Sequence, residues 1–113
     1  MNSNFPQYRA IADNTRRRIL DLLRGESMTA GAIAVAVTGR SKRMTRPAVS
    51  KHLRILRRSK LVTVKKNGRE QIYSLNAEPL RDIDTWISQY EIFWDQQLQS
   101  FKDYVEKNKG DKP

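Results

Sequence analysis

The sequence predicts a mostly α-helical fold that carries one small β-hairpin and ends in a long helix. Thr45 and Pro47 open a short amphipathic helix, which a basic turn at residues 57–60 closes. Two β-rich runs follow directly, at residues 61–64 and 71–75. In the last third of the chain, apolar residues recur at helical spacing. A helix that leads into a basic hairpin is typical of the recognition helix and wing of a winged helix-turn-helix.

Two further helices are expected between a short N-terminal helix and the recognition helix. Asp13 or Asn14 caps the first of them, since a side-chain oxygen there accepts an otherwise unpaired backbone N–H. Thr29 caps the second, and the small residues at 30–37 allow another helix to pack closely. The arginines of the helix that Asp13 or Asn14 caps are expected to stay in solvent: Arg16, Arg17, Arg18 and Arg24.

The recognition helix has one apolar stripe, formed by Val49, Leu53 and Leu56 at i, i+4 and i+7. The polar side chains therefore point outward, and those near the helix N-terminus would meet base edges in a major groove. The planar fork of Arg46 can pair with N7 and O6 of guanine, although a simple phosphate contact is the alternative. Side chains a turn or more further along would hold phosphates. The residues predicted to bind DNA are Thr45, Arg46, Pro47, Ser50, Lys51, Arg54 and Arg57.

The hairpin is expected to turn at Asn67-Gly68, a strong signal for a type I′ turn. Basic side chains crowd its tip, where a wing approaches the flanking minor groove or the DNA backbone. The alternative is a solvated tip whose lysines discourage pairing with other strands. The predicted wing contacts are Lys65, Lys66 and Arg69. Thr29 and Ala30, at a helix N-terminus, are placed to donate backbone N–H groups to a phosphate.

Charge is distributed unevenly along the 113 residues, whose formal net charge is +10. Residues 1–76 carry 17 Lys or Arg and 4 acids, a balance of +13, whereas residues 77–113 carry 5 and 8, a balance of −3. The segment 27–69 holds 12 basic residues and no acid. A run of this kind can be a solvated face, but on a helix-turn-helix pattern a polyanion that releases counterions explains it better.

Pro79 is expected to begin a single helix that runs to about residue 107. About thirty residues of helix span roughly 40 Å, more than a small domain can cover. Together with an overall hydrophobic content of only 38%, this length favours an apolar surface buried against a second copy of the chain. The predicted domains are a DNA-binding domain at 1–94 and, at 95–113, an extension of the dimerisation helix with a polar tail. The predicted dimerisation residues are Leu80, Ile83, Ile87, Tyr90, Trp94 and Phe101.

The segments 10–20 (AIADNTRRRIL) and 28–34 (MTAGAIA), followed by the recognition helix and wing, resemble the ArsR family of bacterial transcriptional repressors. The resemblance covers residues 5 to 90. Asn14 stands where the family usually carries proline, and about five extra residues lie between residue 34 and Thr45. This inserted loop is expected to face the DNA backbone, with a solvated loop as the alternative. Its candidate phosphate contacts are Arg40, Lys42 and Arg43.

No metal site or cofactor is predicted. The chain has no cysteine and a single histidine, His52, which lies at the edge of the core stripe and is expected to have no direct chemical role. Asp82 and Asp84 occupy positions where, as the resemblance implies, some family members place metal-binding carboxylates. Those sites also need histidines, and this helix has none. No nucleophile–base pair is evident either, so the sequence predicts no enzyme.

The function predicted from these patterns is sequence-specific binding of double-stranded DNA by a homodimeric repressor without a metal-sensing site. Twofold symmetry would match it to a pseudo-palindromic operator. The alternative is a non-specific nucleic-acid-binding or RNA-binding module. No apolar run approaches a membrane span and no signal peptide is evident, so a cytoplasmic, nucleoid-associated bacterial protein is expected. An unknown inducer or protein anti-repressor, and activation rather than repression, stay open.

Overall fold

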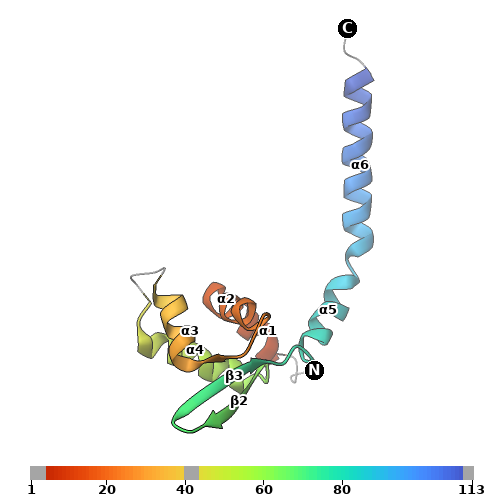
Figure 1. Ribbon diagram of the computed structural model, residues 1–113. Helices are drawn as coiled ribbons and strands as arrows, with labels where there is room; N and C mark the ends of the chain where they lie inside the picture. Colours follow the sequence, from red (N-terminus) through yellow and green to blue (C-terminus); the bar gives the residue numbers. More distant parts are fainter. Residues whose placement is uncertain (1–4, 40–43, 111–113) are drawn as a thin grey trace. The chain divides into compact units, whose positions relative to one another are not determined.

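The computed structural model describes residues 5–39 and 44–110, which divide into two compact units between Asp82 and Ile83. The predicted domain boundary between 94 and 95 stays a prediction. Figure 1 labels the elements. In chain order they are α1 (Phe5–Ile11), α2 (Asn14–Leu23), β1 (Met28–Thr29), α3 (Ala30–Thr38), α4 (Arg46–Arg58), β2 (Val62–Asn67), β3 (Glu70–Leu75), α5 (Leu80–Ser88) and α6 (Glu91–Gly110).

Three helices of the first unit begin at the expected caps. Asp13, Thr29 and Thr45 each have extended backbone, and each side chain accepts the backbone N–H three residues on, at 3.0, 3.1 and 3.3 Å. Each bond satisfies a donor that the first helical turn leaves unpaired. These short-range bonds set where α2, α3 and α4 start.

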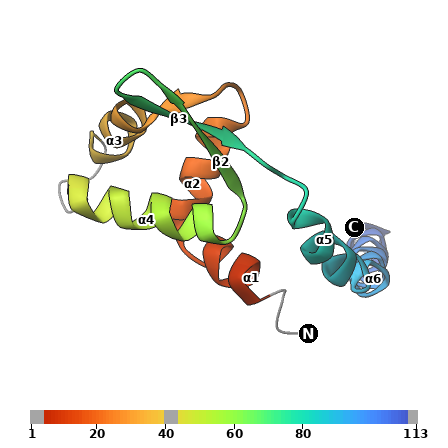
Figure 2. The ribbon, with the colours of Figure 1, turned by 90° about the horizontal axis from the view of Figure 1, so that it is seen from below.

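The core of the first unit is formed by the apolar faces of α2, α3 and α4 with one face of the sheet. The predicted stripe of α4 is confirmed, since Val49, Leu53 and Leu56 are between 0 and 3% exposed. Figures 1 and 2 show α3 and α4 as neighbouring helices, the two helices of a helix-turn-helix. Burial of this one stripe orients α4, so its remaining faces are directed away from the core.

The sheet has three antiparallel strands in the order β1-β3-β2, one more than the sequence predicts. β1 is only two residues long, Met28 and Thr29, and pairs with Tyr73 and Ile72 of β3. A two-residue strand has no periodicity to recognise, so the sequence pattern could not reveal it. Thr29 thus ends β1 and caps α3, which joins the helix-turn-helix to the hairpin.

The prediction of a type I′ turn at Asn67-Gly68 is wrong. The strands extend to Asn67 and Glu70, which pair with each other, so Gly68 and Arg69 are the two central residues. Only Gly68 has positive φ, at 66°. Glycine with positive φ at the first central position is the pattern of a type II′ turn, which also matches the twist of a hairpin. The wing is therefore longer than predicted, and Lys65 and Lys66 are strand residues.

A tight backbone motif ends α4 before the wing begins. Lys60 N–H donates to Arg57 O at 3.0 Å and Leu61 N–H donates to Leu56 O at 3.1 Å. This pair of bonds is a Schellman motif, with Lys60 in the left-handed region at φ 65°. Glycine is usual there, and a side chain costs about 1–2 kcal/mol. The motif turns the chain from α4 into β2.

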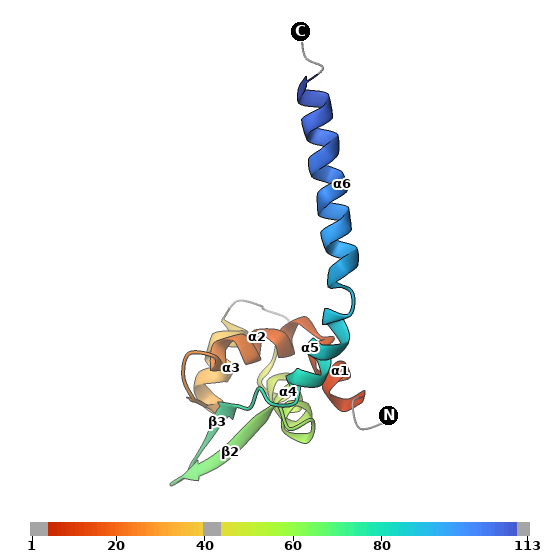
Figure 3. The same cartoon turned by 90° about the vertical axis from the view of Figure 1, so that its right-hand side faces the viewer.

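The single long helix expected from Pro79 is wrong. The chain forms α5 and α6, separated at Gln89 and Tyr90, and Figure 3 shows α6 as one uninterrupted helix. Gln89 and Tyr90 N–H groups donate three residues back instead of four, at 3.3 and 2.9 Å. Ser88 Oγ donates to Thr85 O at 2.9 Å, a side-chain bond of the kind that competes with helical bonds. Neither proline nor glycine marks the break.

Candidate nucleic-acid interface

The outward face of α4 carries the predicted recognition residues. Thr45, which caps the helix, and the six others are exposed: Arg46, Pro47, Ser50, Lys51, Arg54 and Arg57. With the opposite stripe buried, they share the remaining surface of one rigid helix. A helix that offers basic and hydroxyl side chains from its first two turns has the geometry that enters a major groove.

Arg58 belongs to the same surface and is absent from the predicted set. It lies four residues after Arg54, and its side chain is exposed. The helical spacing alone would have placed it beside Arg54 on one face. Because Arg58 sits in the last turn of α4, its charge also interacts favourably with the C-terminal end of the helix dipole.

The wing carries its three basic side chains at or near its turn, and Figures 1 and 3 show the hairpin tip extending below the helices of the first unit. Lys65 and Lys66 are on β2 opposite Ile72 and Gln71, and Arg69 is in the turn. All three basic side chains are exposed. Since successive strand residues point to opposite faces, Lys65 and Lys66 serve different sides of the wing.

A shallow hollow of about 380 Å³ lies between the N-terminus of α3 and the wing. The first-turn N–H groups of Ala30 and Gly31 have no acceptor within the helix. The structure therefore brings the predicted phosphate donors, Thr29 and Ala30, beside the basic side chains of Lys66 and Arg69 on the wing. Its lining residues are Thr29, Ala30, Gly31, Lys66, Arg69, Glu70 and Gln71.

The basic side chains of α4 and the wing have no acidic partner among residues 5–39 and 44–110. The ion pairs there are Arg24–Asp21, Arg81–Glu78 and the contact of His52 with Asp13. Because no nearby acid neutralises these cations, their positive potential is available to attract a polyanion such as DNA. The candidate loop residues Arg40, Lys42 and Arg43 lie outside the described residues.

The predicted dimerisation residues differ in exposure. Leu80 is half-buried against the core of the first unit and Ile83 is 5% exposed. The later ones are open: Ile87 37%, Tyr90 43%, Trp94 49% and Phe101 64% exposed. Other large apolar side chains of α6 are equally exposed, namely Ile92, Phe93, Leu98, Tyr104 and Val105. An apolar surface of this extent is typical of a protein interface.

Within the described residues no three His, Asp or Glu side chains come together as metal ligands. In the same part of the chain, no helix combines the length and apolar character needed to cross a bilayer.

A helix-turn-helix with an exposed basic helix and a basic wing defines the class of winged helix-turn-helix DNA-binding proteins. A family model described as a helix-turn-helix domain matches residues 11–65. The transcriptional repressor SdpR of Bacillus subtilis is 40% identical over 80 residues, which cover 71% of this chain and 83% of SdpR. The HTH-type transcriptional regulator Rv2034 of Mycobacterium tuberculosis is 30% identical over 104 residues, which cover 92% of this chain and 90% of Rv2034.

Solved structures agree with these sequence relatives. An ArsR-like transcriptional regulator from Rhodococcus sp. RHA1 superposes with a TM-score of 0.69 at 26% identity, covering 94% of this chain and 93% of the other. A homodimeric winged helix-turn-helix DNA-binding domain from Mycobacterium bovis has a TM-score of 0.60 at 25% identity, covering 88% and 84%. The chain belongs to the ArsR family of DNA-binding transcriptional regulators. The resemblance and the prediction of a regulator instead of an enzyme are thereby confirmed.

Proposed function

We propose that this chain is a homodimeric repressor that reads a pseudo-palindromic DNA operator with α4 and holds the flanking backbone with the β2–β3 wing. The observation that carries the proposal is the exposed basic surface of α4 and the wing, which has no acidic partner among the described residues. Such a regulator would act at the nucleoid, in the cytoplasm.

Repression and dimerisation are supported by relatives. SdpR is a transcriptional repressor and the Mycobacterium bovis domain is homodimeric. In this chain, the exposed apolar side chains of α5, and those on the face of α6 that carries Trp94 and Phe101, supply the surface that a second copy would cover. Twofold symmetry would place the two α4 helices roughly 34–36 Å apart, one helical turn of DNA.

Selection of preferred duplexes from a random pool tests the proposal. A repressor is expected to enrich an inverted repeat and to bind it far more tightly than random duplex or single strands. Equal affinity for all three would instead indicate the non-specific module. In cells, a reporter fused to the selected operator should be silenced by the protein, and activation of the reporter would overturn repression.

Replacing Arg46 separates base reading from phosphate binding. We expect Arg46→Ala to weaken operator binding by about 1–3 kcal/mol and to relax base preference at one position of each half-site, because one bidentate contact is lost. Lys66→Ala is the matched variant and should weaken all duplexes about equally. The measurement is Kd for the operator, single-base variants and random duplex. A uniform loss in Arg46→Ala would assign Arg46 to the backbone.

Zinc and chelators are expected to leave operator affinity unchanged. His52 is the only imidazole of the chain and there is no cysteine, so a complete zinc site would consist of carboxylates and water. Operator Kd measured after dialysis against chelator, and again with added Zn²⁺, checks this expectation. Stoichiometric zinc binding that released the operator would establish a metal sensor.

A further inference from the structure

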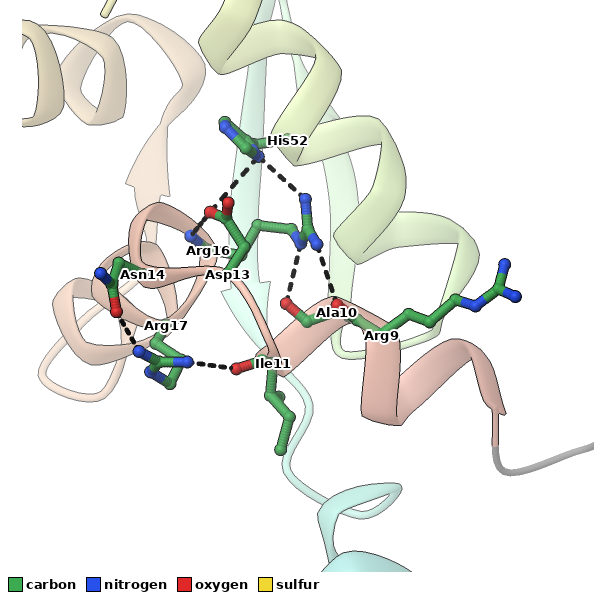
Figure 4. Close-up of polar contacts among 8 residues, drawn as sticks. All are labelled: Arg9, Ala10, Ile11, Asp13, Asn14, Arg16, Arg17 and His52. Carbon is green, nitrogen blue, oxygen red and sulfur yellow. Dashed lines mark hydrogen bonds and ion pairs between the residues drawn. The ribbon is translucent and has the colours of Figure 1, made fainter.

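A polar cluster connects the recognition helix to the two N-terminal helices (Figure 4). We call it the Arg16 cluster: Asp13, Arg16 and His52, with the backbone carbonyls of Arg9 and Ala10. The Arg16 guanidinium donates from Nε to Ala10 O at 2.8 Å and from Nη2 to Arg9 O at 2.8 Å. Its Nη1 lies 3.2 Å from Nδ1 of His52. Arg16, expected in solvent from the sequence, is instead partly buried and connects α1, α2 and α4.

The contact with Arg16 defines the protonation state of His52. A guanidinium has only donors and stays charged, so Nδ1 of His52 must be the acceptor. The imidazole is then neutral and carries its hydrogen on Nε2. Asp13 Oδ2 lies 3.8 Å from the same Nδ1 and accepts the Arg16 backbone N–H at 3.0 Å. A lone pair on Nδ1 therefore favours Arg16, whereas a proton on Nδ1 repels Arg16 and favours Asp13.

The surroundings of His52 disfavour the imidazolium. Its side chain is 17% exposed. Burial lowers the pKa of His52; the charge of Asp13 opposes this, and the charges of Arg16 on α2 and Lys51 on α4 add to it. Burial would raise the pKa of Asp13, but the Arg16 N–H bond and the charges of His52 and Arg16 outweigh burial and lower it. His52 is thus neutral near pH 7 and gains its proton on acidification, opposite a carboxylate that is still ionised.

The cluster holds α4 at its middle, and a second contact holds its C-terminal end. Gln7 Nε2 on α1 donates to Ser59 O at 2.8 Å. These two contacts hold α4 against α1 and α2. Lys51 and Arg54, one residue before and two residues after His52, are exposed on α4. A side chain that contacts a base must be held within roughly 0.5 Å of its productive position, so the orientation of α4 affects how well it reads DNA.

We propose that Arg16 and His52 are positioning residues for DNA reading. Their hydrogen bond holds α4 in its operator-binding orientation, and protonation of His52 breaks this bond and frees α4 to leave that orientation. The inference rests on the proposed function, in which α4 reads duplex DNA. Acidification then weakens operator binding. Simple electrostatics predicts the opposite sign, because an added positive charge strengthens binding to any duplex. The sign therefore separates positioning from charge.

The test measures Kd of the full-length protein at constant ionic strength between pH 8 and pH 5.5. The probes are a duplex selected by the protein at pH 8 and a random duplex of equal length. We expect operator affinity to fall by roughly threefold to tenfold, the worth of one hydrogen bond, as the pH falls. Random duplex should bind equally well or slightly more tightly. Since His52 is the only histidine, no other side chain has its unperturbed pKa in this window.

Substitutions of His52 isolate its contribution. In His52→Asn, the amide oxygen takes the place of Nδ1, can accept from Arg16 and does not titrate, so operator binding should be independent of pH and close to that of the wild type at pH 8. His52→Ala should bind less tightly and also without pH dependence. In NMR, the ring C–H signals of His52 should titrate with a pKa below 6.5. At high pH, the ring nitrogen shifts should show that the hydrogen is on Nε2. A His52 pKa at or above 6.5 would contradict the Arg16 contact.

A lowered pKa also makes a stability prediction with the same sign. Between the folded and unfolded pKa values the unfolded chain binds more protons, so stability falls as the pH drops below about 6.5. The wild-type Tm should therefore fall more than that of His52→Asn. Identical pH profiles of operator binding in the two proteins, or tighter binding of both duplexes on acidification, would overturn the positioning role alone. Absence of any duplex preference at pH 8 would overturn the proposed function and the positioning role with it.

Discussion

A Trp94→Glu, Phe101→Glu double variant is expected to sediment as a monomer and to bind the operator roughly 10²–10⁴-fold more weakly than the wild type, because a second half-site contact is no longer linked to the first. Trp94 and Phe101 are 49% and 64% exposed and lie seven residues, two turns, apart on one face of α6. Aromatic side chains dominate protein interfaces, and a carboxylate in their place would lose its hydration on association.

Ile92 provides the matched control for this variant. It is 59% exposed on the same helix, but at about 100° per residue it lies about 180° around the helix from Phe101. Ile92→Glu should therefore remain a dimer with unchanged operator affinity. Removal of all residues after Tyr90 should reproduce the double variant. A truncated chain that still sediments as a dimer would show that α6 does not form the interface.

The helix-turn-helix could be predicted from the sequence because its signals are short-range. The cap at Thr45 depends on a bond to a residue three positions away, and the stripe of Val49, Leu53 and Leu56 depends on helical periodicity. Both are properties of one helix and need no knowledge of the rest of the fold. The exposed face of α4 follows from the buried one, which is why its candidate residues could be named in advance.

Features that depend on distant partners could not be predicted in this way. β1 exists because Met28 and Thr29 meet Tyr73 and Ile72, more than forty residues later. The expectation that Arg16 stays in solvent failed for the same reason, since one of its partners, His52, is 36 residues away. Periodicity describes one element at a time and carries no information on which elements meet.

The remaining errors arose where two local signals compete. Apolar spacing runs through residues 83–94 without proline or glycine, yet the helical bonds are interrupted near Tyr90. Asn67-Gly68 is a turn signal, but pairing of Asn67 with Glu70 extends the strands and moves the turn by one residue. In both places the residues permit two backbone arrangements, and their order in the sequence does not decide between them.

Operator affinity is expected to fall about 10³–10⁵-fold between about 50 and 200 mM salt, the loss associated with roughly six to ten phosphate contacts. The segment 27–69 has no acidic residue, and the basic side chains of α4 and the wing have no acidic partner within residues 5–39 and 44–110. Each phosphate they neutralise releases counterions, so the logarithm of the association constant should fall linearly with the logarithm of salt concentration. Affinity that hardly changed over this range would contradict the electrostatic role of α4 and the wing.

The slope of the logarithm of the association constant against the logarithm of salt concentration also indicates how many protomers contact the DNA. In a dimer, Lys66→Ala removes one phosphate contact from each copy, so the slope should become shallower by about 1.8, whereas a monomeric complex would lose only about 0.9. Lys107→Ala is the matched control, since Lys107 is also exposed but belongs to α6 in the second unit and not to the helix-turn-helix or the wing. Its slope should equal that of the wild type. Equal flattening in both variants would mean that the salt dependence reports overall charge and not contacts made by the wing.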